Sequence, residues 1–496
     1  MIAIEWLRRP GAQPWGDRLS AALAAGTGRA AGSARTADAT FSALLAHGDP
    51  RRARSWAPAK SGPWTVLFTG HIDNAARASD ELGLASPQPG DLQALAHLYG
   101  LALQKWREQA DIHLIGEYAA IGFDESAQRL RLARSPLRAP PLHYFADATR
   151  IIASTVARAI HGCGVERRID PDKLADAAWF NYANEARDWF KGLRRVPLGS
   201  VVELTPGSET CRSYYDPEAI PRQPSMPMAE RVERAHALLA EGTRAALAGS
   251  TRPAIMLSGG LDSSLVAVKA LEVMPGDAPL NAYTFVTEAD WQPHPMMGRY
   301  TDERPYIERF CQQHPRIVPH FFDNRETPLD VRLNELFLAI GAAPQGLANL
   351  TGYHALWQAA RADGCDRVLL GEFGNLTASA DGSWAYSEYL VRLRWKQLWL
   401  ALRNAPEDRR AMWRRFLALA VFPLLPDSMW QWQRRVRGVE SLYHLASPLR
   451  RDYAMKSGVI ARGLAVGLPN PRFPVRDRLA MLKEVHSNTW GEFSDI

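Results

Sequence analysis

A short strand, a turn of small polar residues and a helix follow one another near the middle of the chain, and this stretch constrains the fold most. Residues 254–257 (AIML) are apolar and predict a buried strand. Residues 258–264 (SGGLDSS) predict a tight turn, and residues 265–274 (LVAVKALEVM) favour a helix that ends at a Pro-Gly pair. Because this order directs backbone N–H groups and the positive end of a helix dipole at one point, it predicts an anion-binding site.

The residue types in the turn indicate which anion it binds. Gly259 and Gly260 let the main chain approach a ligand closely, because no Cβ intervenes. Asp262 would repel a bare phosphate, so we infer a metal between this carboxylate and the anion, and Mg²⁺ suits such oxygen ligands. The turn lacks the Gly-Lys-Ser/Thr ending of a Walker loop, which excludes that class of nucleotide-binding protein.

The composition limits the class of protein. With 496 residues, of which 46% are hydrophobic, the chain is long enough for two or three domains. Its four cysteines form no CxxC pair, which argues against a zinc site or a disulfide framework and fits a reducing cytoplasm. The sequence shows no signal peptide and no apolar run long enough to span a bilayer. The formal charge of +6 is mild and does not require a nucleic-acid partner.

The pattern of apolar residues changes along the chain and predicts two domains. Residues 1–215 contain many short strands and a few helices, typical of an α+β unit, with a helix remnant and a mobile loop expected over residues 20–40. Residues 216–228 are proline-rich and predict a linker. Residues 229–496 alternate helices with apolar strands, which indicates a parallel sheet covered on both faces, and they favour helices after about residue 386.

Ligands on such sheets bind at the carboxyl ends of the strands. This rule places residues 258–264, Val286 and residues 371–375 around one cleft.

The order Ser-Gly-Gly-Leu-Asp-Ser-Ser resembles the pyrophosphate-binding loop of the ATP pyrophosphatases, which split ATP to AMP and pyrophosphate. An ordinary strand-to-helix turn is the alternative, and seven consecutive residues in the right context disfavour it. Residues 67–74, 114–124 and 349–382 resemble segments of the asparagine synthetase family. This resemblance implies an N-terminal Ntn-glutaminase-like αββα domain. It also implies a C-terminal doubly wound parallel-sheet domain of the ATP-pyrophosphatase (adenine nucleotide hydrolase-like) type.

The resemblance also implies a nucleotide site. Leu257, Val286 and Gly371 would line the adenine, and Asp262 would hold Mg²⁺ and take part in catalysis. Glu372 is the candidate for accepting the proton of an attacking amine, with a solvated loop acid as the alternative. The candidate ATP-binding residues are Leu257, Ser258, Gly259, Gly260, Leu261, Asp262, Ser263, Ser264, Val286, Gly371 and Asn375.

Two departures from the family pattern change the expected chemistry. Active members carry a nucleophilic Cys directly after the initiator Met, where this chain has Ile2, and Thr69 replaces the family's oxyanion Asn. We therefore expect a glutaminase-like domain that is inactive and supplies no ammonia. Asn375 stands where the family has a metal-binding Asp, and an amide oxygen is a weaker Mg²⁺ ligand than a carboxylate.

The C-terminal part contains lysine candidates for the active site, a polar end, and two stretches rich in basic and aromatic residues. Lys456 and Lys483 are candidates for a lysine that the family places on a late loop, although neither has a convincing context. The polar end at residues 491–496 suggests a shortened terminal segment or a truncated sequence. Basic and aromatic residues over 392–403 and 430–437 favour packed amphipathic helices, with a surface for a peptide or nucleic acid as the alternative.

Relatives without the N-terminal Cys include lasso-peptide cyclases and β-lactam synthetases. This chain is more similar to the cyclases, because of its Gly-Asn acidic loop and its large basic and aromatic region. The expected function is an ATP-dependent macrocyclase that adenylates an Asp or Glu side chain of a precursor peptide and joins it to the peptide's N-terminal amine. The alternatives are a β-lactam-synthetase-like or ammonia-using amide synthetase, and a catalytically dead scaffold that binds peptide or nucleotide.

The same resemblance implies ATP and Mg²⁺ as cofactors and a linear precursor peptide as the substrate. A leader peptidase and a leader-peptide-binding protein are candidate partners. Neither nucleic acid nor a membrane is expected as a partner, and the expected location is the cytoplasm.

Overall fold

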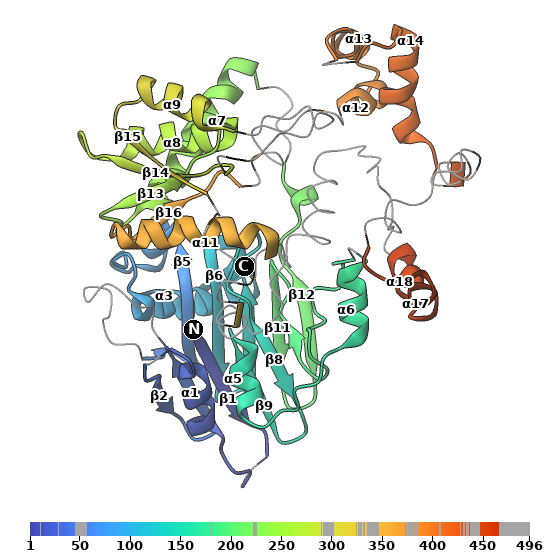
Figure 1. The fold of residues 1–496 in the computed structure, drawn as a ribbon. Coiled ribbons are helices and arrows are strands. Elements are labelled where there is room, and N and C mark those ends of the chain that lie inside the picture. Colours follow the sequence, from blue (N-terminus) through green and yellow to red (C-terminus); the bar gives the residue numbers. More distant parts are fainter. Residues whose placement is uncertain are drawn as a thin grey trace.

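The computed structural model contains two regions of sheet and a set of C-terminal helices (Figure 1). It describes residues 1–465 except for 10, 28, 45–56, 180, 222–225, 289, 291–301, 324, 326–329, 331–332, 335–346, 373, 375–381, 383–384, 406–407, 427, 430–431, 433–435 and 437–446.

The N-terminal region contains two antiparallel sheets of six strands each. The first sheet has the strand order β10 (Arg194–Arg195), β8 (His143–Ala146), β9 (Arg150–Ser154), β1 (Ile2–Leu7), β3 (Ala39–Ala43) and β2 (Gly32–Arg35). The second has the order β12 (Glu209–Ser213), β11 (Ser200–Leu204), β7 (Arg129–Arg134), β6 (Gly116–Asp124), β5 (Trp64–Ile72) and β4 (Ala59–Ser61).

The two sheets pack face to face, and helices cover their outer faces. The shared core joins Ile4 and Phe41 of the first sheet to Ile121 and Leu132 of the second. Because β6 is covered on both faces, its last seven residues are all buried. The helices of this region are α1 (Gly16–Ala24), α2 (Ala75–Leu82), α3 (Leu92–Trp106), α4 (Ala110–His113), α5 (Ala157–Gly162) and α6 (Pro171–Ala178).

Local sequence explains where the best defined of these helices begin. The side chain of Asp91 accepts a hydrogen bond of 2.9 Å from the N–H of Ala94 and caps α3. Asp170 caps α6 in the same way, and Pro171 occupies the first helical position, as the sequence predicts. The helix remnant expected over residues 20–40 is confirmed as the end of α1, whereas the mobile loop expected beside it is wrong, because the segment also contains all of β2 and the start of β3.

The C-terminal region contains a parallel sheet of four strands with helices on both faces. Its order is β15 (Ile317–Phe322), β14 (Leu280–Phe285), β13 (Pro253–Met256) and β16 (Arg367–Leu369). One core cluster joins the sheet to α8 (Leu261–Val273) and α9 (Arg304–Gln313), and another joins it to α11 (Leu347–Ala362). The helix α7 (Met228–Leu247) packs beside α8 (Figure 1). The predicted fold class is therefore confirmed for both regions.

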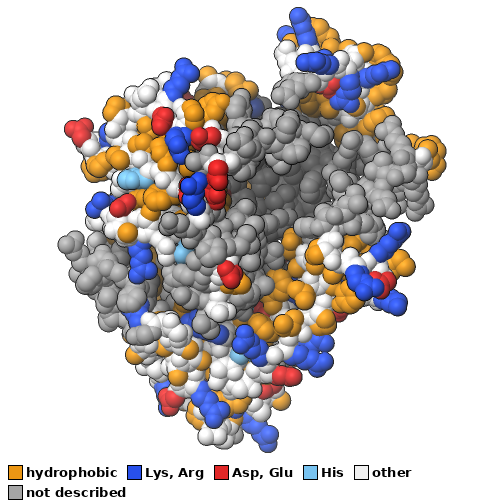
Figure 2. Space-filling model, in the orientation of Figure 1, with side chains coloured by type: hydrophobic (Ala, Val, Ile, Leu, Met, Phe, Trp, Pro, Cys, Tyr) orange, Lys and Arg blue, Asp and Glu red, His pale blue; other side chains and the backbone are white. Residues whose placement is uncertain are grey.

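In the residues that the structure describes from Ala385 onward, the helices form two groups. The first contains α12 (Ala385–Val391), α13 (Trp395–Arg403) and α14 (Met412–Arg415), with a π-helical turn over Phe416–Val421, around a small core that includes Leu398 and Leu402. Figure 1 shows this group standing apart from the sheets, and Figure 2 shows Lys, Arg and apolar side chains gathered on it. The second group, α17 (Arg451–Lys456) and α18 (Val459–Ala465), packs against α6. In the part of the chain that the structure describes, no helix is long and apolar enough to cross a membrane.

Candidate active site

A cleft of about 460 Å³ opens at the carboxyl edge of the parallel sheet. The ends of β13, β14 and β16 meet there with the first turn of α8 and the middle of α11. This is the place where ligands bind on open parallel sheets. The lining residues are Met256, Leu257, Ser258, Gly260, Asp262, Ser263, Tyr283, Phe285, Glu303, Gly352, Tyr353, Leu356, Leu370, Gly371 and Glu372.

The loop between β13 and α8 is held in place by hydrogen bonds of its own and by β14. The N–H of Leu257 donates to the carbonyl of Tyr283 at 3.0 Å, and its carbonyl accepts from the Thr284 hydroxyl at 2.7 Å. The Ser258 N–H donates to the Ser263 Oγ at 3.0 Å, and the two serine hydroxyls lie 2.9 Å apart. The loop is therefore already ordered at the start of α8, where N–H groups and the helix dipole favour an anion.

Two glycines allow the segment after β16 to lie directly on this loop. A Cβ on Gly371 would lie 2.5 Å from the backbone N of Ser263, and one on Gly374 would lie 2.0 Å from Cγ of Asp262. Both distances are shorter than a carbon contact allows, so larger residues would separate the two segments. The close approach places Glu372 in the same cleft as Asp262.

A magnesium ion would find carboxylate oxygens in this cleft. Asp262, Glu303 and Glu372 all line it. Among the described residues, however, no group of three or more His, Cys, Asp or Glu side chains is close enough to hold a metal by itself. This donor set fits an ion that arrives with the phosphates of a nucleotide and takes Asp262 as its protein ligand.

Tyr353 of α11 faces Glu372 across the cleft. Burial raises the pKa of the Tyr353 hydroxyl, and the nearby charge of Glu372 and a hydrogen bond between the two side chains raise it further. The hydroxyl therefore stays protonated and is available as a hydrogen-bond donor to the carboxylate of Glu372. Sequence reasoning does not select Tyr353, because it lies 19 positions before Glu372 on a different element.

The structure brings together most, but not all, of the candidate residues. Leu257, Ser258, Gly260, Asp262, Ser263, Gly371 and Glu372 line the cleft. Gly259, Leu261 and Ser264 belong to the loop and helix start but are not among the lining residues. Val286 is buried and donates its N–H to the carbonyl of Phe322, and its neighbour Phe285 lines the cleft instead. Asn375 and Lys483 lie outside the described residues, and Lys456 ends α17, away from the lining of the cleft.

The position expected for glutamine chemistry lies in the N-terminal region. Ile2 and Thr69 line one small cavity of about 100 Å³, whose other walls are mostly apolar and include Leu67, Phe68 and Leu92. None of the four cysteines of the chain lines this cavity. The lining residues thus offer no thiol nucleophile there.

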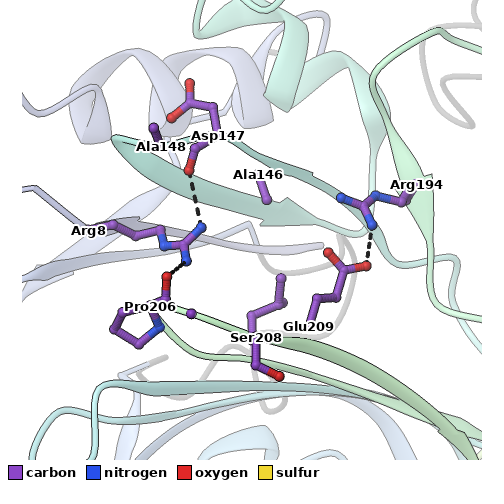
Figure 3. Close-up of a pocket in the computed structure, with 10 residues that line it drawn as sticks. Arg8, Ala146, Asp147, Ala148, Arg194, Pro206, Ser208 and Glu209 are labelled. Atoms are coloured by element: carbon purple, nitrogen blue, oxygen red, sulfur yellow. Dashed lines mark hydrogen bonds and ion pairs between the residues drawn. The ribbon is translucent and has the colours of Figure 1, made fainter.

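A larger cavity of about 490 Å³ lies between the end of β1, the β8–β9 turn and the β11–β12 hairpin (Figure 3). Arg8 donates to the carbonyls of Asp147 at 3.2 Å and Thr205 at 2.8 Å, and Arg194 forms an ion pair with Glu209. These cations already have partners within the protein, so we assign this cavity a role in holding the hairpin rather than in catalysis.

The fold and the cleft define a class of protein in which an Ntn-glutaminase-like domain precedes a nucleotide-binding domain of the ATP-pyrophosphatase type. Comparisons with known proteins agree. Residues 54–215 match the glutamine amidotransferase domain family, and residues 234–480 match the asparagine synthase family. Residues 234–480 are thus similar to the asparagine synthases, whose synthase domain is an amide-forming, ATP-dependent ligase that releases AMP and pyrophosphate.

Three curated relatives are similar to parts of the chain. Asparagine synthetase [glutamine-hydrolyzing] 3 of Bacillus subtilis is 23% identical over 261 residues, which is 51% of this chain and 42% of that protein. Amidase chyE of Penicillium rubens is 28% identical over 165 residues (33% of this chain, 24% of that protein). Amidase chry2 of Gibberella zeae is 28% identical over 159 residues (31% of this chain, 23% of that protein). The chain thus spans less than half the length of these relatives.

The solved structures that match parts of the chain include a glutamine phosphoribosylpyrophosphate amidotransferase of Bacillus subtilis. It is 13% identical, with a TM-score of 0.25, over 53% of this chain and 57% of that one. An allosteric regulatory enzyme of purine biosynthesis is 12% identical, with a TM-score of 0.30, over 74% of this chain and 89% of that one.

Proposed function

We propose that the protein is an ATP-dependent carbon–nitrogen ligase that closes a ring in a peptide, as a lasso-peptide cyclase does. The observation that carries the proposal is that the loop of residues 258–264 and the segment of residues 371–372 meet in one cleft. The serine–glycine loop of residues 258–264 is built for the phosphates of ATP, and Glu372 lies on the segment that rests against it. ATP and a carboxylic acid would therefore react beside a group able to accept an amine proton.

The proposed reaction has two steps. A carboxylate oxygen of an Asp or Glu side chain forms a bond to the α-phosphorus of ATP, the bond from that phosphorus to the bridging oxygen breaks, and pyrophosphate leaves. The amine nitrogen of the same peptide then forms a bond to the acyl carbon, its proton passes to Glu372, and AMP leaves. Because both reacting groups belong to one bound molecule, the second step is intramolecular.

The protein's own residues would act at defined points of this reaction. The loop of residues 258–264 binds the departing pyrophosphate. Asp262 is the residue that would hold Mg²⁺, which would neutralise charge on the phosphates. Tyr353 orients Glu372 for the second step.

The mostly apolar cavity at Ile2 and Thr69 supports an amine, rather than ammonia from glutamine, as the nitrogen donor. A precursor peptide is the proposed substrate. A leader peptidase and a leader-peptide-binding protein are proposed to prepare it, and neither nucleic acid nor a membrane is required.

The proposal is tested by incubating the protein with ATP, Mg²⁺ and candidate linear peptides, each with a free N-terminal amine and one internal Asp or Glu. We expect AMP and pyrophosphate, together with a peptide lighter by one water in the mass spectrum. The control peptide carries an acetylated N-terminus and should not lose water. Release of ADP instead of AMP, or an amide formed only when ammonium is added, would overturn the cyclase assignment.

A further inference from the structure

Glu303, which precedes the first residue of α9, touches the serine–glycine loop. One of its carboxylate oxygens accepts a hydrogen bond of 3.1 Å from the N–H of Gly259. The side chains of Glu303 and Tyr306 both lie 3.5 Å from the point where a Cβ of Gly259 would be. A negatively charged group of the protein therefore occupies a place at which the loop offers an N–H to an anion.

The N–H groups of the residues on either side of Gly259 donate to serine hydroxyls instead of to a carboxylate. Ser258 donates to the Ser263 hydroxyl at 3.0 Å, and Gly260 donates to the Ser258 hydroxyl at 3.3 Å. Both acceptors are neutral hydroxyl oxygens that belong to the loop itself. Glu303 thus differs from them in its charge and in coming from another element.

The side chain of Glu303 is free to move while its backbone is fixed. Its carbonyl accepts hydrogen bonds from the N–H groups of Tyr306 at 3.1 Å and Ile307 at 3.2 Å, which anchor the start of α9. The residue is only partly buried, so its carboxylate can turn to water without a large desolvation cost.

We propose that Glu303 is an intramolecular anion that occupies the pyrophosphate position of the serine–glycine loop and exchanges with the phosphates of ATP. This inference rests on the proposed function, because it assumes that the loop binds a polyphosphate. An N–H donates well to only one oxygen at a time, and two anions on the same loop repel each other. The phosphates therefore displace the carboxylate when ATP binds.

The exchange has a consequence at the end of adenylation. When pyrophosphate leaves, Glu303 returns to the Gly259 N–H, so this donor is not left without an acceptor. The carboxylate would then compete with rebinding of pyrophosphate and favour its release. Glu303 is in this view a positioning residue that acts on the loop and makes no bond to the reacting atoms.

The test measures binding of inorganic pyrophosphate by isothermal titration calorimetry, without divalent metal and with a chelator present. Glu303→Ala removes the competing anion, and we expect its dissociation constant to fall about fivefold, within the range of one net hydrogen bond. Glu303→Gln keeps an acceptor but removes the charge, so its effect should be smaller and in the same direction. Glu308→Gln is the matched control, because it removes a charge from an exposed position of the same helix away from the loop. It should change the constant less than twofold.

Three results would overturn the inference. An unchanged or higher dissociation constant in both Glu303 variants would show that the carboxylate does not compete. If the dissociation constant of the Glu308→Gln control falls as much as that of the Glu303 variants, the effect is a general effect of net charge. Absence of pyrophosphate binding by every variant would overturn the proposed function as well. Pyrophosphate binding that is equally tight in the wild-type protein and in both Glu303 variants would overturn this inference alone.

Discussion

Arg462 of α18 binds Asp176 of α6 through hydrogen bonds of 2.8 and 3.1 Å from its Nε to the two carboxylate oxygens. The two residues are 286 positions apart. Around them, Ala175 and Trp179 of the N-terminal region pack against Ala454 and Val459. The last helices that the structure describes are therefore fastened to the N-terminal region.

Replacement of Arg462 by Ala should loosen this attachment. Burial raises the pKa of Asp176 even though Arg462 opposes the shift, so the variant would leave a poorly solvated carboxylate without its cation. We expect a loss of about 1–3 kcal/mol of local stability, seen as faster proteolysis near residues 447–465. Arg450→Ala is the control, because the side chain of Arg450 is 85% exposed and pairs with Asp452 in the first turn of the helix that Arg450 precedes. It should change the rate little, and equal rates for both variants would contradict the prediction.

The stability of α6 should depend on pH through Asp170. Burial opposes ionisation of this carboxyl, but hydrogen bonds from Arg187 and from the N–H of Asp172 outweigh burial and lower its pKa. A lowered folded-state pKa adds stability that is fully present above the unfolded pKa of about 3.9. That stability is lost as the pH falls through the folded value. Asp170→Ala should cost about 1–2 kcal/mol at neutral pH, measured by urea denaturation, and the difference from wild type should shrink below pH 4. A difference that is constant with pH would contradict the role of ionised Asp170.

Asp262→Asn should remove adenylation while the protein stays folded. The carboxylate is the protein ligand proposed for Mg²⁺, and its loss should slow formation of AMP on the order of 100-fold or more. Asp277→Asn, an exposed acid beyond the end of α8, is the matched control and should retain full activity. Calorimetric titration with Mg²⁺ and a non-hydrolysable ATP analogue supplies an independent readout. Full turnover by Asp262→Asn would disprove the metal assignment.

Tyr353→Phe should separate the two proposed steps. The variant keeps the ring but removes the hydroxyl that orients Glu372. We expect exchange of labelled pyrophosphate into ATP, which reports adenylation, to be unchanged. Ring closure should slow on the order of 10- to 100-fold, because a misplaced proton acceptor is inefficient. Equal loss in both assays would instead indicate that Tyr353 supports the whole cleft.

Gly371→Ala should damage the contact between the two loops. Its Cβ would lie 2.5 Å from the backbone N of Ser263, and backbone cannot yield as a flexible side chain can. A cost of about 1–3 kcal/mol is expected, together with weaker ATP binding, measured by thermal denaturation and calorimetry. Gly242→Ala is the control, because no atom lies within 4 Å of a Cβ there and Ala favours the helix α7. Wild-type binding by Gly371→Ala would refute the steric argument.

The fold class was predictable because its signals are local. The buried strands of the parallel sheet are short apolar runs, α8 is followed by a Pro-Gly pair, and α9 has a proline in its first turn. Residues 20–40 gave no such signal. The strand β3 (Ala39–Ala43) consists largely of small residues, and all five are buried because the second sheet and α1 cover them. Its structure depends on packing between elements, which no window of sequence records.

In the candidate site too, some residues could be predicted from local sequence, and others depend on packing between elements. The loop of residues 258–264 is one continuous segment, so its residues and their chemistry follow from their order. Glu303 and Tyr353 come from two other helices, and only the folded sheet brings them to the loop. Val286 was selected because it follows a strand, yet the hydrogen bond to Phe322 keeps it in the sheet while Phe285 lines the cleft.

The attachment of α18 to α6 gives the N-terminal region a task that needs no chemistry. A chain that lost this region would lose the surface on which its own C-terminal helices fold, whether or not glutamine is ever hydrolysed there. Selection on the C-terminal half alone would therefore also act on α6 and on the residues that hold this helix in place.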